Sequence, residues 1–215
     1  MKPILYMLEA SPASRAVSIV AKILDLTLDE REIDILNGEH LKEEYLKLNP
    51  LHTMPVLDDD GKIICDSHTI NTYLISKHGK NDSLYPRDLY KRALVDQKLA
   101  FDLGTLFPIL RTVDLAYMRK EIKALTPKMI EEIDNVYKFL EIFLKSSQWI
   151  ALDCITVADI HCVTTVLCLD YHMKINPKLY PNTFNWIKRC QKLPCFESDL
   201  KRLQSFERFF DTFKK

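Results

Sequence analysis

Residues 49–65 place the strongest single constraint on the fold, because they combine a turn, a proline and a hairpin signal. Asp60-Gly61 lies between two short apolar runs, and an Asp-Gly pair in that setting is typical of a tight β-hairpin. Pro55 opens the first run, and a strand tolerates proline only at its first residue, at an edge or at a bulge. Such a proline is a candidate cis bond whose neighbouring backbone could pair with an extended ligand, although an ordinary loop that enters a strand would look the same.

The first eighty residues alternate short apolar runs with helical segments around this hairpin. Ser11-Pro12 is a typical helix start, with serine at the N-cap and proline at the first helical position. The order βαβαββα combines parallel crossovers with a terminal antiparallel hairpin, and it predicts a small α/β sheet domain over residues 1–80. The predicted strands are Pro3–Met7, Arg31–Ile35, Pro55–Leu57 and Lys62–Cys65, and the predicted helices run from Pro12, from Gly38 to Leu48 and from Ser67 to His78.

Residues 81–87 form the predicted linker, because asparagine, aspartate, serine and proline cluster there. No later segment has the pattern of a strand, which predicts an all-α domain over residues 88–215. Pro108 is expected to kink the first long helix, and Thr156-Val157-Ala158-Asp159 is a capping box that opens a helix apolar on most sides. The predicted helices are Asp88 to about Lys120, one from Thr126-Pro127, one from Thr156, Pro181–Lys192 and Phe196–Phe213.

Composition excludes several classes of function. The 30 basic and 30 acidic residues cancel, which argues against a nucleic-acid or anionic-membrane surface as the main partner. The four glycines form no G-x-G-x-x-G or G-x-x-x-x-G-K pattern, so a glycine-rich phosphate loop is excluded. No apolar run suits a membrane span or a signal peptide, and the six cysteines contain no C-x-x-C pair. These features predict a cytoplasmic protein with free thiols.

Four motifs occur in a fixed order along the chain. They are Ser11-Pro12-x-x-Arg15, Asn49-Pro50-x-His52-x-x-Pro55, Asp66-Ser67-His68 and Thr156-x-Ala158-Asp159. Together they resemble the cytosolic glutathione transferases of the insect delta/epsilon type, and Gly38-Glu39-His40-Leu41 looks closer to the epsilon branch. The resemblance implies a thioredoxin-like N-terminal domain with a cis-proline at Pro55, followed by a C-terminal helical bundle. It also implies a homodimer that uses glutathione as a cosubstrate, with no metal or prosthetic group.

A glutathione site must hold two carboxylates, one ammonium group and a thiol. Ser67 at a helix N-terminus offers a hydroxyl and a backbone N–H to the γ-glutamyl carboxylate, and Asp66 can pair with the ammonium group. Both residues are equally good as plain helix caps. The resemblance assigns the backbone of Met54 to the cysteinyl part of glutathione, and places two histidines near the glycyl carboxylate. The predicted glutathione-binding residues are His40, His52, Met54, Pro55, Asp66, Ser67 and His68.

Ser11 is the predicted catalytic residue. A free thiol has a pKa of about 8.5, and a hydroxyl at the start of a helix stabilises the thiolate through a hydrogen bond and the helix dipole. The serine then acts as a donor and needs no histidine base. Ser11 is also a good structural cap. Two rivals are Tyr6, near the catalytic tyrosine of other classes, and Ser14, where delta/epsilon proteins often have cysteine.

The resemblance places the electrophile site between the domains, along the long helix. Phe206, Phe209, Phe210 and Phe213 form a stripe at helical spacing, which is usually core packing but can wall the substrate site in this family. The candidates for this hydrophobic site are Phe107, Leu110, Arg111, Leu115, Arg119, Phe206 and Phe210.

Three further expectations concern metal, stability and function. His161 and His172 are eleven residues apart and have no third ligand at a suitable spacing, so no metal site is predicted. Leu152 stands where relatives usually have glycine, so its turn must differ or carry strain.

The predicted activity is conjugation of glutathione to small hydrophobic electrophiles, with a possible peroxidase side activity. The alternative is a non-catalytic binding or assembly protein with the same fold, and the sequence does not choose among substrates.

Overall fold

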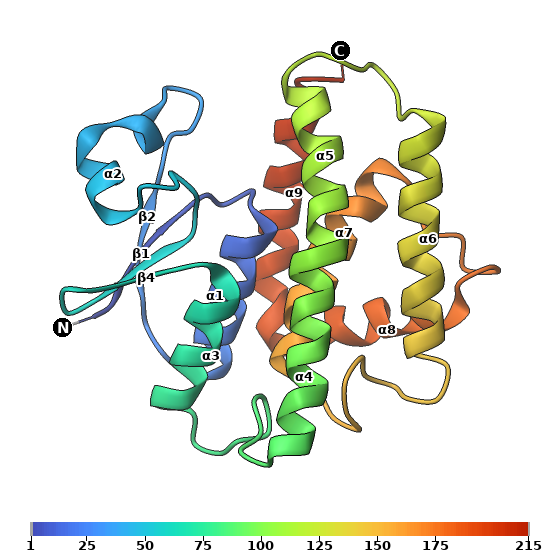
Figure 1. Cartoon of the computed structure of the whole chain (residues 1–215), viewed down its shortest axis with the longest axis horizontal. Helices are drawn as coiled ribbons and strands as arrows, with labels where there is room; N and C mark the ends of the chain where they lie inside the picture. The colour runs from blue at the N-terminus through green and yellow to red at the C-terminus, as the bar shows by residue number, and fades with distance from the viewer. Residues whose placement is uncertain (1, 215) are drawn as a thin grey trace.

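The computed structural model describes residues 2–214, and it contains a small mixed sheet beside a larger group of helices (Figure 1). The strand order is β2-β1-β3-β4. Strand β1 (Ile4–Met7) pairs in parallel with β2 (Asp29–Glu32) and antiparallel with β3 (Val56–Asp59), which pairs antiparallel with β4 (Lys62–Cys65). The predicted combination of a parallel crossover and a terminal hairpin is confirmed.

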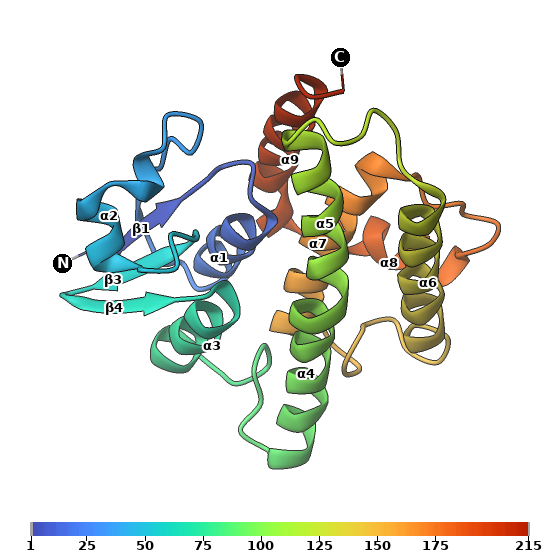
Figure 2. The same ribbon diagram turned by 45° about the horizontal axis from the view of Figure 1, so that its top comes forward.

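Helices cover both faces of this sheet. Helices α1 (Pro12–Ile23) and α3 (Ser67–His78) lie on one face, where Leu5, Leu57 and Leu74 are fully buried together. The short helix α2 (Glu43–Leu48) covers the other face through Tyr45, which packs with Ile33 and Val56. Figure 2 shows α1 and α3 between the sheet and the helices of the second half. The residues of β1 alternate between the two faces, as a pleated strand requires.

Two elements of this half differ from the sequence prediction. The second strand begins two residues earlier than predicted, and every residue of Asp29–Glu32 is exposed. Such an edge strand is held by backbone pairing to β1, so its side chains carry no alternating signal. The predicted helix Gly38–Leu48 divides into a 3₁₀ turn at Glu39–Leu41 and α2, because Lys42 between them is extended with ψ of 151°.

The hairpin has the predicted turn chemistry. Asp60 and Gly61 have φ of 58° and 80°, the left-handed conformations that a two-residue hairpin turn needs. The Gly61 N–H also donates to Asp58 Oδ1 at 2.8 Å. At the start of the hairpin, the Met54–Pro55 peptide bond is cis.

The second half is helical throughout the described residues. Helices α4 and α5 are joined by a π-helical segment and run on as one long column in Figure 1. Pro108 is the second residue of α5 and has no N–H to donate, and the π-helical segment lies directly before it. The helical elements are α4 (Leu89–Phe101), η2 (Asp102–Leu106), α5 (Phe107–Met118), α6 (Pro127–Phe143), α7 (Val157–His172), α8 (Pro181–Gln191), η3 (Pro194–Phe196) and α9 (Glu197–Asp211).

Helix α7 is the centre of this half, and the predicted capping box at its start is present. Asp159 Oδ2 accepts from the Thr156 N–H at 2.8 Å, while Oδ1 accepts from the Ile150 N–H and the Trp186 indole. Every residue from Val157 to Leu169 is buried. Leu152 is not among the described residues with positive φ, so the preceding turn differs from a glycine-type turn.

Residues 2–214 contain no helix that is long and apolar enough to cross a membrane. All six cysteines are free thiols.

Candidate active site

Ser11 lies at the junction of the strand β1 loop and helix α1. Its backbone is extended, with φ of −71° and ψ of 124°, and its Oγ accepts the Ser14 N–H at 3.4 Å. Ser11 is therefore the N-cap of α1, at the positive end of the helix dipole. Because the hydroxyl is an acceptor in the cap, its own proton remains available for an anion at this helix terminus.

The loop that carries Ser11 is held from two sides. Both carboxylate oxygens of Glu32 on β2 accept the Glu9 N–H at 3.0 Å. From the other side, Ser205 of α9 donates to Glu9 Oε2 at 2.9 Å. The cap hydroxyl is thus fixed relative to both the sheet and the last helix.

The two rivals of Ser11 have other partners. Ser14 is fully buried, and its Oγ accepts the Leu8 N–H at 3.3 Å, so this hydroxyl supports the loop from inside. Tyr6 packs on the face of the sheet that α2 covers, away from α1. Its hydroxyl accepts a hydrogen bond from Arg31 Nη1 at 3.5 Å. Of the two serines in or before the first turn of α1, Ser11 alone is partly exposed, and Tyr6 lies on the other face of the sheet.

Asp66 and Ser67 begin helix α3 with an unusual backbone. Asp66 has φ of 73° and ψ of 124°, a sparsely populated conformation for an aspartate. Its Oδ1 accepts the N–H groups of His68 and Thr69, both at 3.0 Å. Burial opposes the charge of Asp66, but the hydrogen bonds from His68 and Thr69 outweigh it and lower the pKa to about 2. The carboxylate therefore remains ionised at neutral pH. Backbone strain of this kind is often found at ligand sites.

The turn before the cis-proline is held by buried polar groups. The Tyr45 hydroxyl and Asn49 Nδ2 both donate to the Thr53 carbonyl, at 2.7 and 2.9 Å. His52 in this turn has φ of 47°, and its ring lies 6.0 Å from that of His40. The structure therefore brings together the two histidines that the sequence analysis placed near one carboxylate.

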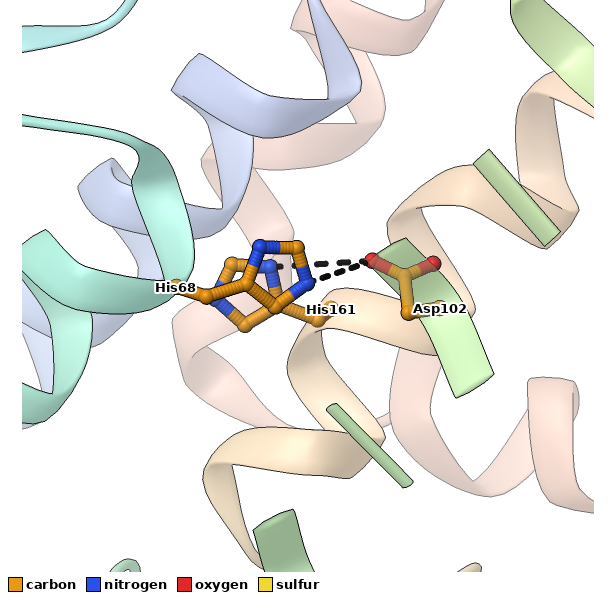
Figure 3. A group of neighbouring side chains, drawn as sticks. All are labelled: His68, Asp102 and His161. Carbon is orange, nitrogen blue, oxygen red and sulfur yellow. Dashed lines mark hydrogen bonds and ion pairs between the residues drawn. The ribbon is translucent and has the colours of Figure 1, made fainter. Parts of the chain in front are cut away.

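His68 points away from this turn and into the second half of the chain. Its Nε2 contacts Asp102 Oδ2 at 2.9 Å, and its ring stacks on that of His161 at 3.9 Å (Figure 3). His161 Nδ1 lies 3.9 Å from the same carboxylate oxygen, and Asn71 Nδ2 lies 2.9 Å from His161 Nε2. The cluster joins α3 to η2 and α7. Sequence reasoning missed it because its members come from three separate elements.

The grouping of two histidines and one carboxylate raises the question of a metal ion. The ligand atoms of His68, Asp102 and His161 lie within 4.8 Å of one another. However, both imidazoles direct a nitrogen at the same Asp102 oxygen, and their planes are only 13° apart. A metal ion must lie near each ring plane, on the nitrogen lone pair. Stacked rings hold their lone pairs side by side and do not direct them at one point, and Asp102 Oδ2 already lies 2.9 Å from His68 Nε2, so the geometry fits a hydrogen-bonded cluster and not a metal centre.

The two histidines of the cluster favour different protonation states. Burial opposes protonation of His68, but Asp102 and Asp66 outweigh it and raise its pKa to about 9. Burial lowers the pKa of His161 well below its usual value, and the neighbouring His68 lowers it further. His68 is therefore the cation of the cluster at neutral pH and His161 is neutral.

This cluster predicts a pH dependence of stability. Because the pKa of His68 is higher in the folded chain than in the unfolded chain, its stabilising effect is complete below about pH 6.5 and is lost as the pH rises through about 9. We expect the contribution of His68 to the free energy of unfolding to fall by about 3 kcal/mol over this interval. Urea titrations at several pH values would measure it. In His68→Gln the slope between these limits should become shallower, leaving the part that comes from the buried thiols, and an unchanged slope would contradict the assignment.

The predicted electrophile-site residues divide into two groups. Phe107 and Leu115 are half-buried and Arg111 and Arg119 are exposed, so these four can border a cleft. Leu110, Phe206 and Phe210 are buried in the core beneath them. On α9, the half-buried members of the phenylalanine stripe are Phe209 and Phe213.

Comparison with known proteins matches both halves of the chain. The family model of the glutathione S-transferase N-terminal domain matches residues 5–82, and that of the C-terminal domain matches residues 106–194. Glutathione S-transferase 1 of Manduca sexta is 42% identical over 195 residues, which cover 90% of this chain and 89% of the relative.

Solved structures of glutathione transferases are also similar to this chain along nearly its whole length. An epsilon-class glutathione S-transferase from the housefly, Musca domestica, superposes with a TM-score of 0.96 at 38% identity, covering 99% of this chain and 98% of that one. A glutathione transferase homologue from Drosophila mojavensis with bound glutathione has a TM-score of 0.95 at 37% identity, covering 98% and 97%. The chain therefore belongs to the glutathione S-transferase family.

Proposed function

We propose that this protein conjugates the thiolate of glutathione to small hydrophobic electrophiles, with Ser11 as the hydrogen-bond donor to the sulfur. The observation that carries the proposal is the position of Ser11, a half-buried hydroxyl at the N-terminus of α1 on a loop fastened to both β2 and α9. A donor at a helix N-terminus lowers the pKa of a nearby thiol.

The chemistry follows from that position. Glutathione loses its thiol proton to solvent, and the resulting thiolate attacks the electrophilic carbon as the leaving group departs with its electron pair. The protein lowers the barrier by stabilising the thiolate and by holding the two reactants close together. Neither step requires a general base from the chain.

We assign the recognition of glutathione to residues 1–80 and the hydrophobic site to residues 88–215, with 81–87 between them. Asp66 is an ionised carboxylate for the ligand's ammonium group, and Ser67 offers the N-terminus of α3 to the γ-glutamyl carboxylate. We assign the backbone of Met54, beside the cis-proline Pro55, to the cysteinyl part. We assign His40 and His52 to binding of the glycyl carboxylate. His68 supports the site from behind, through Asp66 and Asp102.

Two measurements test this function. Retention on immobilised glutathione tests binding, and conjugation of glutathione to 1-chloro-2,4-dinitrobenzene tests catalysis. We expect both. Retention without turnover would support the alternative, a non-catalytic binding protein on the same fold. The free thiols of all six cysteines fit a reducing compartment, and we place the protein in the cytoplasm.

We also propose that the protein is a homodimer. Leu51, Leu89, Tyr90 and Leu103 are large apolar side chains that are at least half exposed, and a partner subunit would cover them. We expect sedimentation at twice the mass of one chain, and a shift towards the monomer in Leu103→Glu. Ile142→Glu, a matched change on the outer helix α6, should leave the dimer intact. If the dimer persists in both variants, the interface lies elsewhere on the surface.

A further inference from the structure

A buried carboxyl–imidazole pair lies inside the helical half and has no part in the chemistry described above. Asp114 Oδ1 of α5 is 2.8 Å from Nε2 of His172, the last residue of α7. The His172 side chain has no exposed surface, whereas that of Asp114 is 17% exposed. Among residues 2–214, His172 is the hydrogen-bond partner of the Asp114 side chain, and the His172 Nδ1 has none.

The pair is surrounded by aromatic rings. Tyr117 stacks on His172 at 5.4 Å with planes 8° apart. Phe206 and Phe210 of α9 meet the same imidazole edge-on, at 5.9 and 5.3 Å. This apolar enclosure raises the pKa of Asp114 well above its usual value and lowers that of His172 to about 3. Both groups are therefore neutral at pH 7, and the O–H of the carboxylic acid donates a hydrogen bond to Nε2 of the imidazole. Its second oxygen remains as a carbonyl acceptor.

Asp114 lies on the face of α5 that also carries two residues assigned to the electrophile site. Asp114 follows Phe107 by seven residues and Arg111 by three, so the three side chains lie along one face of α5. His172 contacts Phe206 and Phe210 on the opposite side, on the helix that also bonds to the Ser11 loop through Ser205. The pair thus lies between α5 and α9, beneath the residues that border the site.

The C-terminal end of α9 covers the same enclosure. The Lys214 ammonium lies 3.7 Å from the centre of the Tyr171 ring and 5.3 Å from that of Tyr117. The Tyr171 hydroxyl donates to Asp211. These contacts hold the end of the helix over the pair and limit the access of water. A hydrogen bond made there by a ligand therefore competes little with solvent.

We propose that Asp114, held in place by His172, is a specificity-determining residue that selects hydrophobic ligands carrying a hydroxyl or N–H donor. This inference rests on the proposed electrophile site. A purely apolar pocket discriminates weakly among hydrophobic ligands, whereas a buried polar group that is left unpaired penalises every ligand that cannot bond to it. The donor of the ligand would bond to the free oxygen of Asp114 while its rings pack among the aromatic side chains.

Direct binding tests the inference without depending on catalysis. The probes are 1-naphthol and 1-methoxynaphthalene, which share their rings and their oxygen but differ in the O–H donor. Calorimetric titration of the full chain should give a dissociation constant about tenfold lower for 1-naphthol, the effect of one hydrogen bond in a dry site. Equal dissociation constants for the two probes would overturn the proposal, whether or not the protein conjugates glutathione.

Variants of α5 test whether Asp114 causes the preference for 1-naphthol. In Asp114→Leu the preference for 1-naphthol should disappear, whereas the isosteric Asp114→Asn should keep it, because the amide N–H can donate to His172 and the amide oxygen remains as the acceptor. Thr112→Leu adds a similar apolar side chain at an exposed position of the same helix and should keep the preference. A preference that survives in Asp114→Leu would assign selection to another residue. Absence of conjugation in the wild type, with the ligand preference intact, would instead contradict the proposed function alone.

Discussion

Replacement of Ser11 by alanine is expected to lower kcat/KM for conjugation of 1-chloro-2,4-dinitrobenzene by about 100- to 1,000-fold, the loss typical of one preorganised donor to a developing or stabilised anion. The hydroxyl stands at the N-terminus of α1, and no other hydroxyl of the loop is available to replace it. Ser14 is fully buried and bonds to Leu8, and Tyr6 lies on the other face of the sheet. The absorbance of the thiolate of bound glutathione should disappear with the activity.

Control variants separate catalysis from helix capping. Ser11→Asn removes the hydroxyl but keeps a good N-cap, so it should be stable and still nearly inactive. Ser11→Thr keeps both the hydroxyl and the cap and should retain most activity. Tyr6→Phe and Ser14→Ala should preserve the thiolate absorbance. Loss of that absorbance in Tyr6→Phe alone would show that the tyrosine, and not Ser11, activates the thiol.

Asp199→Asn is expected to destabilise the fold by about 3–5 kcal/mol, because it leaves a buried charge without its partner. Asp199 of α9 binds Arg15 of α1 through two hydrogen bonds, Nε to Oδ1 at 2.7 Å and Nη2 to Oδ2 at 2.8 Å. The Arg15 side chain has no exposed surface, and that of Asp199 is 2% exposed. Burial works against the charge of Arg15, but its bonds to Asp199 and Cys168 outweigh this and keep its pKa above the usual value. Because a guanidinium group stays protonated in proteins, Arg15 keeps its charge when the carboxylate is lost.

A second ion pair between the same parts of the chain provides the matched control. Arg202 of α9 pairs with Glu30 of β2, but both side chains reach solvent. Arg202→Gln should cost no more than about 1 kcal/mol. The double variant Arg15→Met/Asp199→Leu should recover much of the stability, because it removes both buried charges together. Chemical denaturation would measure all three, and equal losses in Asp199→Asn and Arg202→Gln would contradict the importance of burial.

Much of the molecule could be predicted from local patterns. The turn at Asp60-Gly61, the caps at Ser11 and Thr126, and the capping box at Thr156 were all visible because each depends on residues a few positions apart. Elements without such local patterns were predicted less accurately. Strand β2 is exposed along its whole length, and the π-helical segment before Pro108 has no sequence signal that distinguishes it from an α-helix.

The sequence by itself determined the order of strands and helices and the family, and it predicted the residues at helix N-termini to which we assign glutathione and its thiolate. The tertiary structure alone decided which distant side chains meet: His68 with Asp102 and His161, Arg15 with Asp199, and Asp114 with His172. The physical reason is that caps and turns are local bonds within a few residues. These pairs exist only because helices far apart in the chain pack side by side, and their burial then sets the charge and the strength of each pair.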